Sequence, residues 1–138
     1  MPELHSAAGA TYVAQLLICA LLGILFLQSG IDKVVDRRGN LEWLTGHFAK
    51  SPLAGVVPAL LLILTLLEIA AGALSAVGGV IVAIGGDSTI AFYGAALSGA
   101  TIVALIFGQR MPKEYPGAAA LVPYFLVTVA GIYLLGGR

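Results

Sequence analysis

VVPALLLILTLLEIAAGALSAVGG, residues 56–79, is an apolar stretch that contains a single ionisable side chain, Glu68. Since a helix rises 1.5 Å per residue, Glu68 lies roughly 18 Å from the first residue of the stretch, near the midplane of a hydrocarbon layer about 30 Å thick. A carboxylate exposed to lipid at that depth is costly. The stretch therefore predicts a membrane-spanning helix that turns Glu68 toward the protein interior.

Steps of three and four residues along the helix from Glu68 lead to a stripe of small and polar side chains. These residues are Thr65, Gly72, Ser75 and Gly79. A second stripe, suited to close helix contact, runs along the first apolar segment through Gln15, Cys19, Gly23, Phe26 and Gly30. We expect the two stripes to face each other.

The composition of the 138 residues, 59% hydrophobic and 10% charged with a mean hydropathy of +1.01, lies outside the range of soluble domains. Four apolar segments approach or exceed the ~20 residues that a spanning helix requires. They cover residues 11–31, 56–79 with an alternative end at 84, 88–108 and 117–135. The sequence predicts an all-α fold, an integral membrane four-helix bundle that forms one domain over residues 1–138.

The long connection between the first two spans predicts a short amphipathic helix on the membrane surface, with Asn40 as its N-cap. Trp43 fits the aromatic belt of the interface, and His47 stands four residues later on the same side of this helix. The later sequence Gly85-Gly86-Asp87-Ser88 predicts the turn between the second and third spans.

Basic residues are distributed unevenly between the two sides of the predicted bundle. Loops one and three contain six of them, Lys33, Arg37, Arg38, Lys50, Arg110 and Lys113, whereas the other side contains only Arg138. The positive-inside rule therefore places loops one and three in the cytoplasm and both termini outside.

Several kinds of chemistry find no support in the sequence. The lone cysteine, Cys19, excludes an intrachain disulfide and a Cys-x-x-Cys redox centre. His5 and His47 are predicted on opposite sides of the membrane, so no metal site is expected. The formal net charge is zero and no basic run is long enough to indicate binding of nucleic acid.

The order of several motifs resembles the DoxX family of small four-span bacterial membrane proteins. The motifs that carry this resemblance are FLQSGIDK at residues 26–33, NLEWL at 40–44, HF at 47–48, PL at 52–53, and Leu67-Glu68 followed by Gly72. The resemblance covers most of the chain and implies an inner-membrane protein, in a family named after the membrane part of a thiosulfate:quinone oxidoreductase. The family's glycine, lysine and mid-membrane glutamate correspond to Gly30, Lys33 and Glu68.

Glu68 has two interpretations. It could exchange a proton with a bound quinone, with Gln28, Ser29 or Tyr124 as hydrogen-bond donors, and it is then the candidate catalytic residue. Alternatively, it is a protonated carboxyl group that bonds a Ser, Thr or backbone group across the bundle. Lys33 is interpreted as an anchor that directs its ammonium toward the headgroups, and the alternatives are a lipid phosphate, an acidic partner or a quinone head.

The leading functional hypothesis is a subunit of a quinone-linked redox assembly, which binds other membrane subunits and lipids and is not catalytic alone. No covalently bound cofactor is expected, and quinone is the candidate ligand. The alternative is an accessory structural subunit of a larger membrane complex with no chemistry of its own. A small transporter is disfavoured because four spans contain only one deep ionisable residue, Glu68.

Overall fold

The fold consists of helices, seen in a computed structural model that describes residues 5–49, 54–110 and 115–136. In chain order the elements are α1 (Ala7–Val35), α2 (Arg37–His47), the 3-10 turn η1 (Ala54–Val56), α3 (Val57–Ala83), α4 (Thr89–Arg110) and α5 (Tyr115–Leu135). Four of them, α1, α3, α4 and α5, are long and apolar enough to cross a membrane. The predicted all-α four-helix bundle is confirmed.

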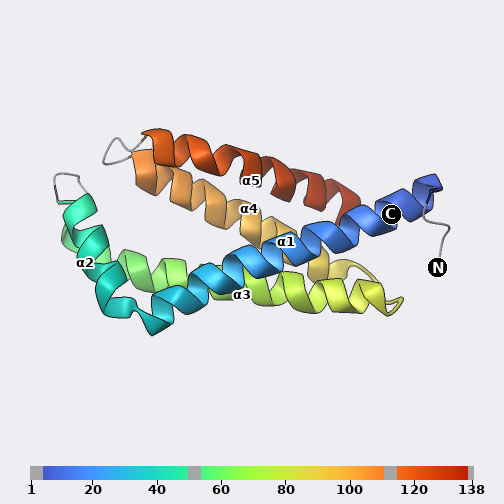
Figure 1. The fold of residues 1–138 in the computed structure, drawn as a ribbon, viewed down its shortest axis with the longest axis horizontal. Helices are drawn as coiled ribbons and strands as arrows, with labels where there is room; N and C mark the ends of the chain where they lie inside the picture. Colours follow the sequence, from blue (N-terminus) through green and yellow to red (C-terminus); the bar gives the residue numbers. More distant parts are fainter. Residues whose placement is uncertain (1–4, 50–53, 111–114, 137–138) are drawn as a thin grey trace.

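The four long helices pack side by side in the order α1, α3, α4 and α5, and α5 returns to contact α1. Their shared core is built from buried apolar side chains such as Leu22, Phe26, Ala71, Ala95 and Ile102. The shorter α2 contacts α1 and α3 and lies at the end of the bundle where α1 stops, which we call the α2 end (Figure 1). This end is the one that carries the charged residues of the first connection.

The first helix is longer at both ends than the predicted span of residues 11–31. It begins at Ala7 because the hydroxyl of Ser6 accepts a hydrogen bond from the amide of Gly9 at 3.0 Å, which caps the N-terminus. It ends at Val35, so Asp32 and Lys33 lie within its last turns. The charged residues Asp32 and Lys33 mark the end of the apolar part of α1. The helix itself continues to Val35, because charged side chains do not interrupt its backbone hydrogen bonds.

The second span, α3, runs through Gly79 to Ala83, which settles the alternative ends in favour of the longer helix. Pro58 lies in its first turn, where its missing N–H costs no hydrogen bond. The predicted turn before α4 is confirmed, since Gly85 adopts a φ of 92° that other residues rarely accept. That turn reverses the chain, so α4 returns antiparallel to α3.

The short helix α2 exists as predicted, but Asn40 is not its N-cap. The helix begins at Arg37, and the carboxylate of Asp36 accepts a hydrogen bond from the amide of Gly39 at 3.3 Å. The Asn40 side chain instead donates to the carbonyl of Asp36 at 2.9 Å and to the Asp32 carboxylate at 3.4 Å. An earlier acceptor, Asp36, therefore caps the helix and leaves Asn40 to link α2 to α1.

Glycines determine how closely the spans approach. A Cβ at Gly72 of α3 would lie only 2.7 Å from the backbone nitrogen of Leu27 of α1, and a Cβ at Gly78 would overlap the backbone of Ala91 of α4. Gly30 of α1 likewise faces Ile69 and Glu68 of α3. Cys19 and Gly30 of the first small-residue stripe meet Gly79 and Glu68 of the second, so the expectation that the two stripes face each other is confirmed for these residues. Gln15 instead donates a hydrogen bond to the carbonyl of Leu134 of α5 at 2.6 Å, and Ser75 lies against Gly94 of α4.

We expect Gly78→Ala to destabilise the bundle by about 1–3 kcal/mol, because the added methyl group overpacks the contact with α4. Gly46→Ala in α2 is the matched control, since a Cβ there would meet no atom within 4 Å. The control should leave stability unchanged or raise it by up to about 1 kcal/mol through helix propensity. Thermal unfolding of both variants in one detergent checks this, and equal melting temperatures would show that the α3–α4 contact is looser than described.

Candidate functional site

A buried ion pair joins α1 to α3. The Lys33 ammonium donates hydrogen bonds to the Glu68 carboxylate at 3.1 Å and to the hydroxyl of Ser29 at 2.8 Å. Glu68 is 2% exposed and the Lys33 side chain 14% exposed. Ser29 precedes Lys33 by one helical turn, so it supports the ammonium from the same helix. The pair thus neutralises the acid that the sequence places in the interior.

The interpretation of Lys33 as a headgroup anchor is corrected by this contact. Its stem leads the ammonium inward to Glu68, because the register of α1 on α3 sets Gly30 beside that residue. An acidic partner, one of the alternatives for Lys33, is what the structure provides.

The level of Glu68 in the bundle is described by its place along α1 and along α3. Gly30, which faces Glu68, lies five residues before the end of α1, or about 8 Å by helix rise. Glu68 therefore lies level with the last turns of α1, whereas within α3 it lies eleven residues, about 17 Å by helix rise, after the first residue. The apolar run alone gives the position of Glu68 within α3, but not how far α3 is shifted along α1.

A bond from Glu68 to a Ser or Thr hydroxyl across the bundle, the alternative interpretation, is not found among the described residues. The Thr65 hydroxyl donates to the carbonyl of Leu61 at 2.7 Å, and the Thr101 hydroxyl donates to that of Leu97 at 2.7 Å. Ser75 has a buried hydroxyl with no hydrogen-bond partner among the described residues. Bonding within their own helices leaves Lys33 as the partner that Glu68 is seen to have.

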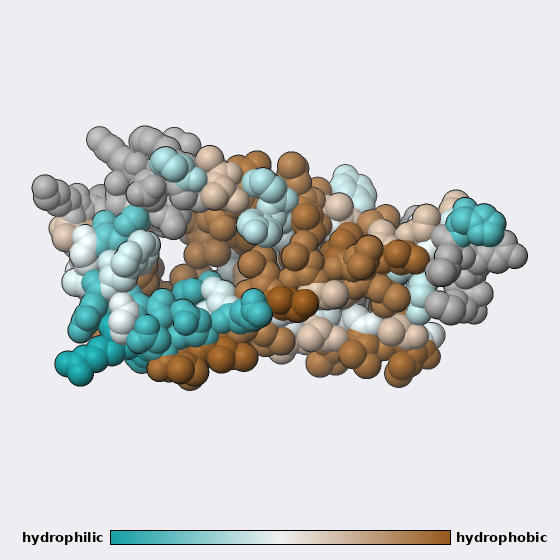
Figure 2. Space-filling model, viewed as in Figure 1, coloured by the Kyte–Doolittle hydropathy of each residue, from teal (hydrophilic) through white to brown (hydrophobic). Residues whose placement is uncertain are grey.

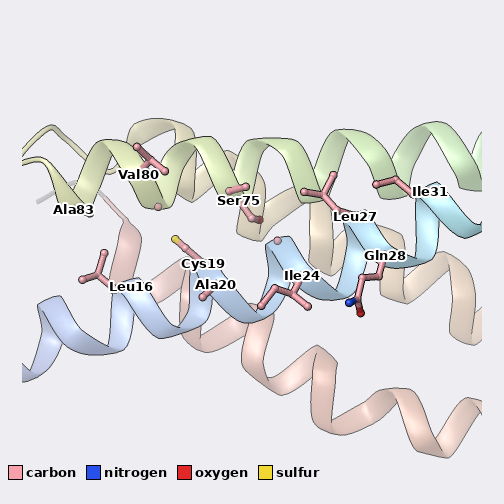
Figure 3. Close-up of a pocket in the computed structure, with 13 residues that line it drawn as sticks. Leu16, Cys19, Ala20, Ile24, Leu27, Gln28, Ile31, Ser75, Val80 and Ala83 are labelled. Atoms are coloured by element: carbon pink, nitrogen blue, oxygen red, sulfur yellow. The ribbon is translucent and has the colours of Figure 1, made fainter.

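A groove with a volume of about 520 Å³ runs along the outside of the α1–α3 contact (Figure 3). Small residues, among them Cys19, Gly23, Ala76 and Gly79, form part of its wall. Gln28 lines the same groove and is exposed, and no hydrogen bond to its amide is found among the described residues. Glu68 and Lys33 are not among the residues that line this groove, so the ion pair lies beside it and not in it.

The remaining predicted site residues fall into separate places. Gly30 and Gly72 are the buried points of approach between α1 and α3. Tyr124 is 37% exposed on α5, and no hydrogen bond joins it to Glu68 within the described ranges. Trp43 is 59% exposed, and its ring stacks on that of His47 with centroids 4.6 Å apart, as their spacing of four residues indicates. The bundle therefore brings together Gly30, Lys33, Glu68 and Gly72, and leaves Tyr124 outside.

The polar surface is concentrated at the α2 end, over α2 and the last turns of α1 (Figure 2). Exposed charged residues there are Asp32, Asp36, Arg37, Arg38 and Glu42. Apolar side chains dominate the rest of this face. The ion pair thus lies just inside the boundary between a polar end and an apolar body, where Lys33 links the two.

Within the described ranges no three His, Cys, Asp or Glu side chains gather closely enough to hold a metal ion. Comparisons of the chain with protein-family models, curated proteins and solved structures give no match. The ion pair and the groove are consequently interpreted from their own geometry.

We expect Lys33→Met to destabilise the bundle by about 3–5 kcal/mol, because it leaves the buried Glu68 carboxylate without its counterion, and Glu68→Leu to cost less, because the Lys33 left unpaired is only part-buried. The double variant should recover most of that loss, since apolar pairs often replace buried ion pairs without cost. Arg38→Met with Glu42→Leu is the control cycle, because that pair is exposed and separated by 3.6 Å. Unfolding in detergent measures both couplings, and additive effects at Lys33 and Glu68 would contradict a buried pair.

Proposed function

We propose that this chain is an accessory four-span subunit of a bacterial inner-membrane redox assembly, in which it holds a partner helix and is not catalytic by itself. The observation that carries the docking role is the amide of Gln28, which has no hydrogen-bond partner among the described residues and lies on a groove of small residues. The redox and quinone-linked character of the assembly rests on the resemblance to the DoxX family.

The chemistry of the groove supports a helix as its occupant. Small residues such as Gly23 and Ala76 let a second backbone approach, and dispersion contacts then replace contacts with lipid. The Gln28 amide can both donate and accept a hydrogen bond. A polar side chain of a partner helix that lies beside Gln28 would form a hydrogen bond with this amide. Such a bond between helices contributes about 0.6–2 kcal/mol in membranes. The remaining affinity would come from packing along the groove.

The geometry of Glu68 supports a structural role for this residue. Its carboxylate is 2% exposed and already bound to Lys33, so a ligand would first have to displace the ammonium. A group that acts on a substrate needs access to it within hydrogen-bond distance. The closed ion pair therefore favours an accessory subunit over a quinone site at this position.

We expect Gln28→Leu and Ala20→Leu to lower retention of the partner subunit, because the first removes the amide and the second fills the groove. Ala130→Leu, at an exposed position on α5 away from the groove, is the matched control and should retain the partner. Quantitative mass spectrometry of membrane proteins that co-purify with the tagged chain in mild detergent gives the result. Absence of any stoichiometric membrane subunit with the wild-type chain would refute the accessory role.

A second candidate function, a proton or quinone site at Glu68, is favoured by one observation, the 14% exposure of the Lys33 side chain. The variant Glu68→Gln distinguishes the accessory role from a proton or quinone site. An accessory role predicts less retention of the subunit and unchanged quinone-dependent turnover per assembled complex. Lower turnover in a fully assembled complex would instead support a site at Glu68, and Glu42→Gln at the exposed α2 surface is the control.

We propose that the α2 end lies in the cytoplasm, in agreement with the basic residues of loops one and three. In a Cys19→Ala background, Thr45→Cys on α2 and Asp87→Cys after α3 provide single exposed thiols at opposite ends. A membrane-impermeant maleimide should label only Asp87→Cys in intact cells and both variants after permeabilisation. Labelling of Thr45→Cys in intact cells would reverse the orientation.

A further inference from the structure

The amphipathic helix α2 buries its apolar face only in part among the described residues, since Leu41 and Leu44 are half-buried. None of the residues of α2, Arg37–His47, is buried, although Leu41 and Leu44 recur at helical spacing, and Phe48 directly after the helix is 7% exposed. A helix of this kind normally gains its stability by packing such a face against a core. The described residues therefore leave part of the apolar face of α2 uncovered.

A pocket of about 480 Å³ occupies the space between α2, α3 and α4. Its walls are apolar, with Leu44 from α2, Leu64 and Leu67 from α3, and Val103 and Phe107 from α4. The stacked rings of Trp43 and His47 also line it. The volume lies within the ~300–1,000 Å³ of ordinary ligand pockets. Apart from these two rings the described lining offers no polar side chain, so polar groups of a ligand would find partners only beside Trp43 and His47.

The surroundings of the pocket identify what reaches it. Ile63, Val103 and Phe107 line the pocket and are 54%, 54% and 59% exposed on spanning helices, so the pocket opens to the hydrocarbon layer that covers those helices. Water gains too few hydrogen bonds to fill an apolar cavity of this kind. Acyl chains are the apolar molecules present at this level of a bilayer.

We propose that an acyl chain of a bilayer phospholipid inserts beneath α2 and completes its packing against α3 and α4. The chain contacts Leu44, Leu64 and Phe107, and the Trp43–His47 ring pair borders it. Burial of the apolar faces on both sides stabilises this position of α2. The lipid site lies on α2, α3 and α4, whereas the proposed partner helix docks on α1 and α3. Either of these two proposals can therefore be wrong while the other holds.

Trp43 supplies the probe, because it is the only tryptophan of the chain and lines the pocket. The wild-type protein and Ala104→Phe, which fills the pocket from α4, are reconstituted in vesicles of phosphatidylcholine brominated on the acyl chains. Bromine quenches indole fluorescence on contact. We expect wild-type Trp43 to be quenched more than Trp43 of Ala104→Phe, and Ala130→Phe on exposed α5 to match the wild type.

A second measurement is independent of fluorescence. Native mass spectrometry after detergent exchange should find one retained phospholipid on the wild-type chain and on Ala130→Phe, and loss of that phospholipid from Ala104→Phe. If Ala104→Phe does not fold, the smaller Ala104→Val replaces it, with partial loss expected. Equal quenching and equal lipid retention in the filled and wild-type proteins would overturn the proposal, as would a second copy of the chain or a non-phospholipid in place of the retained lipid.

Discussion

A carboxylate and an ammonium in a bundle interior are each costly alone, and in this protein they meet. Lys33 from α1 and Glu68 from α3 lie 3.1 Å apart, with Ser29 completing the shell of the ammonium. Neither charge can separate without leaving the other desolvated, so the pair fixes the position of one helix along the other. The close glycine contacts at Gly30 and Gly72 depend on that same register.

The rest of the bundle follows from close approach between spans. In a membrane the hydrophobic effect does not drive helices together, because lipid tails are as apolar as leucine side chains. Contacts such as Gly72 on Leu27 and Gly78 on Ala91 supply dispersion attraction instead. The molecule is tightly joined along α1, α3 and α4, whereas α2 has no buried residue and covers a pocket.

This division bears on function. The charged side chains inside the bundle are engaged with each other, and the open surfaces are apolar grooves on its outside. Such an arrangement suits a subunit that other membrane components bind, more than one that transforms a substrate. Gln28, an amide without a partner among the described residues, is the point at which a second membrane protein would add a hydrogen bond.

The sequence by itself determined the four apolar spans, the inward face of α3 with Thr65, Gly72 and Ser75, and the turn at Gly85, because hydropathy and helical periodicity are local properties. The candidate site was predicted only as separate residues, Lys33 and Glu68. Their pairing, the level of Glu68 along α1 and the pocket beneath α2 were decided by the tertiary structure, since they depend on the register between helices distant in sequence. That register depends on the Lys33–Glu68 pair and on which side chains permit close contact, a property of two helix surfaces together that neither segment reveals alone.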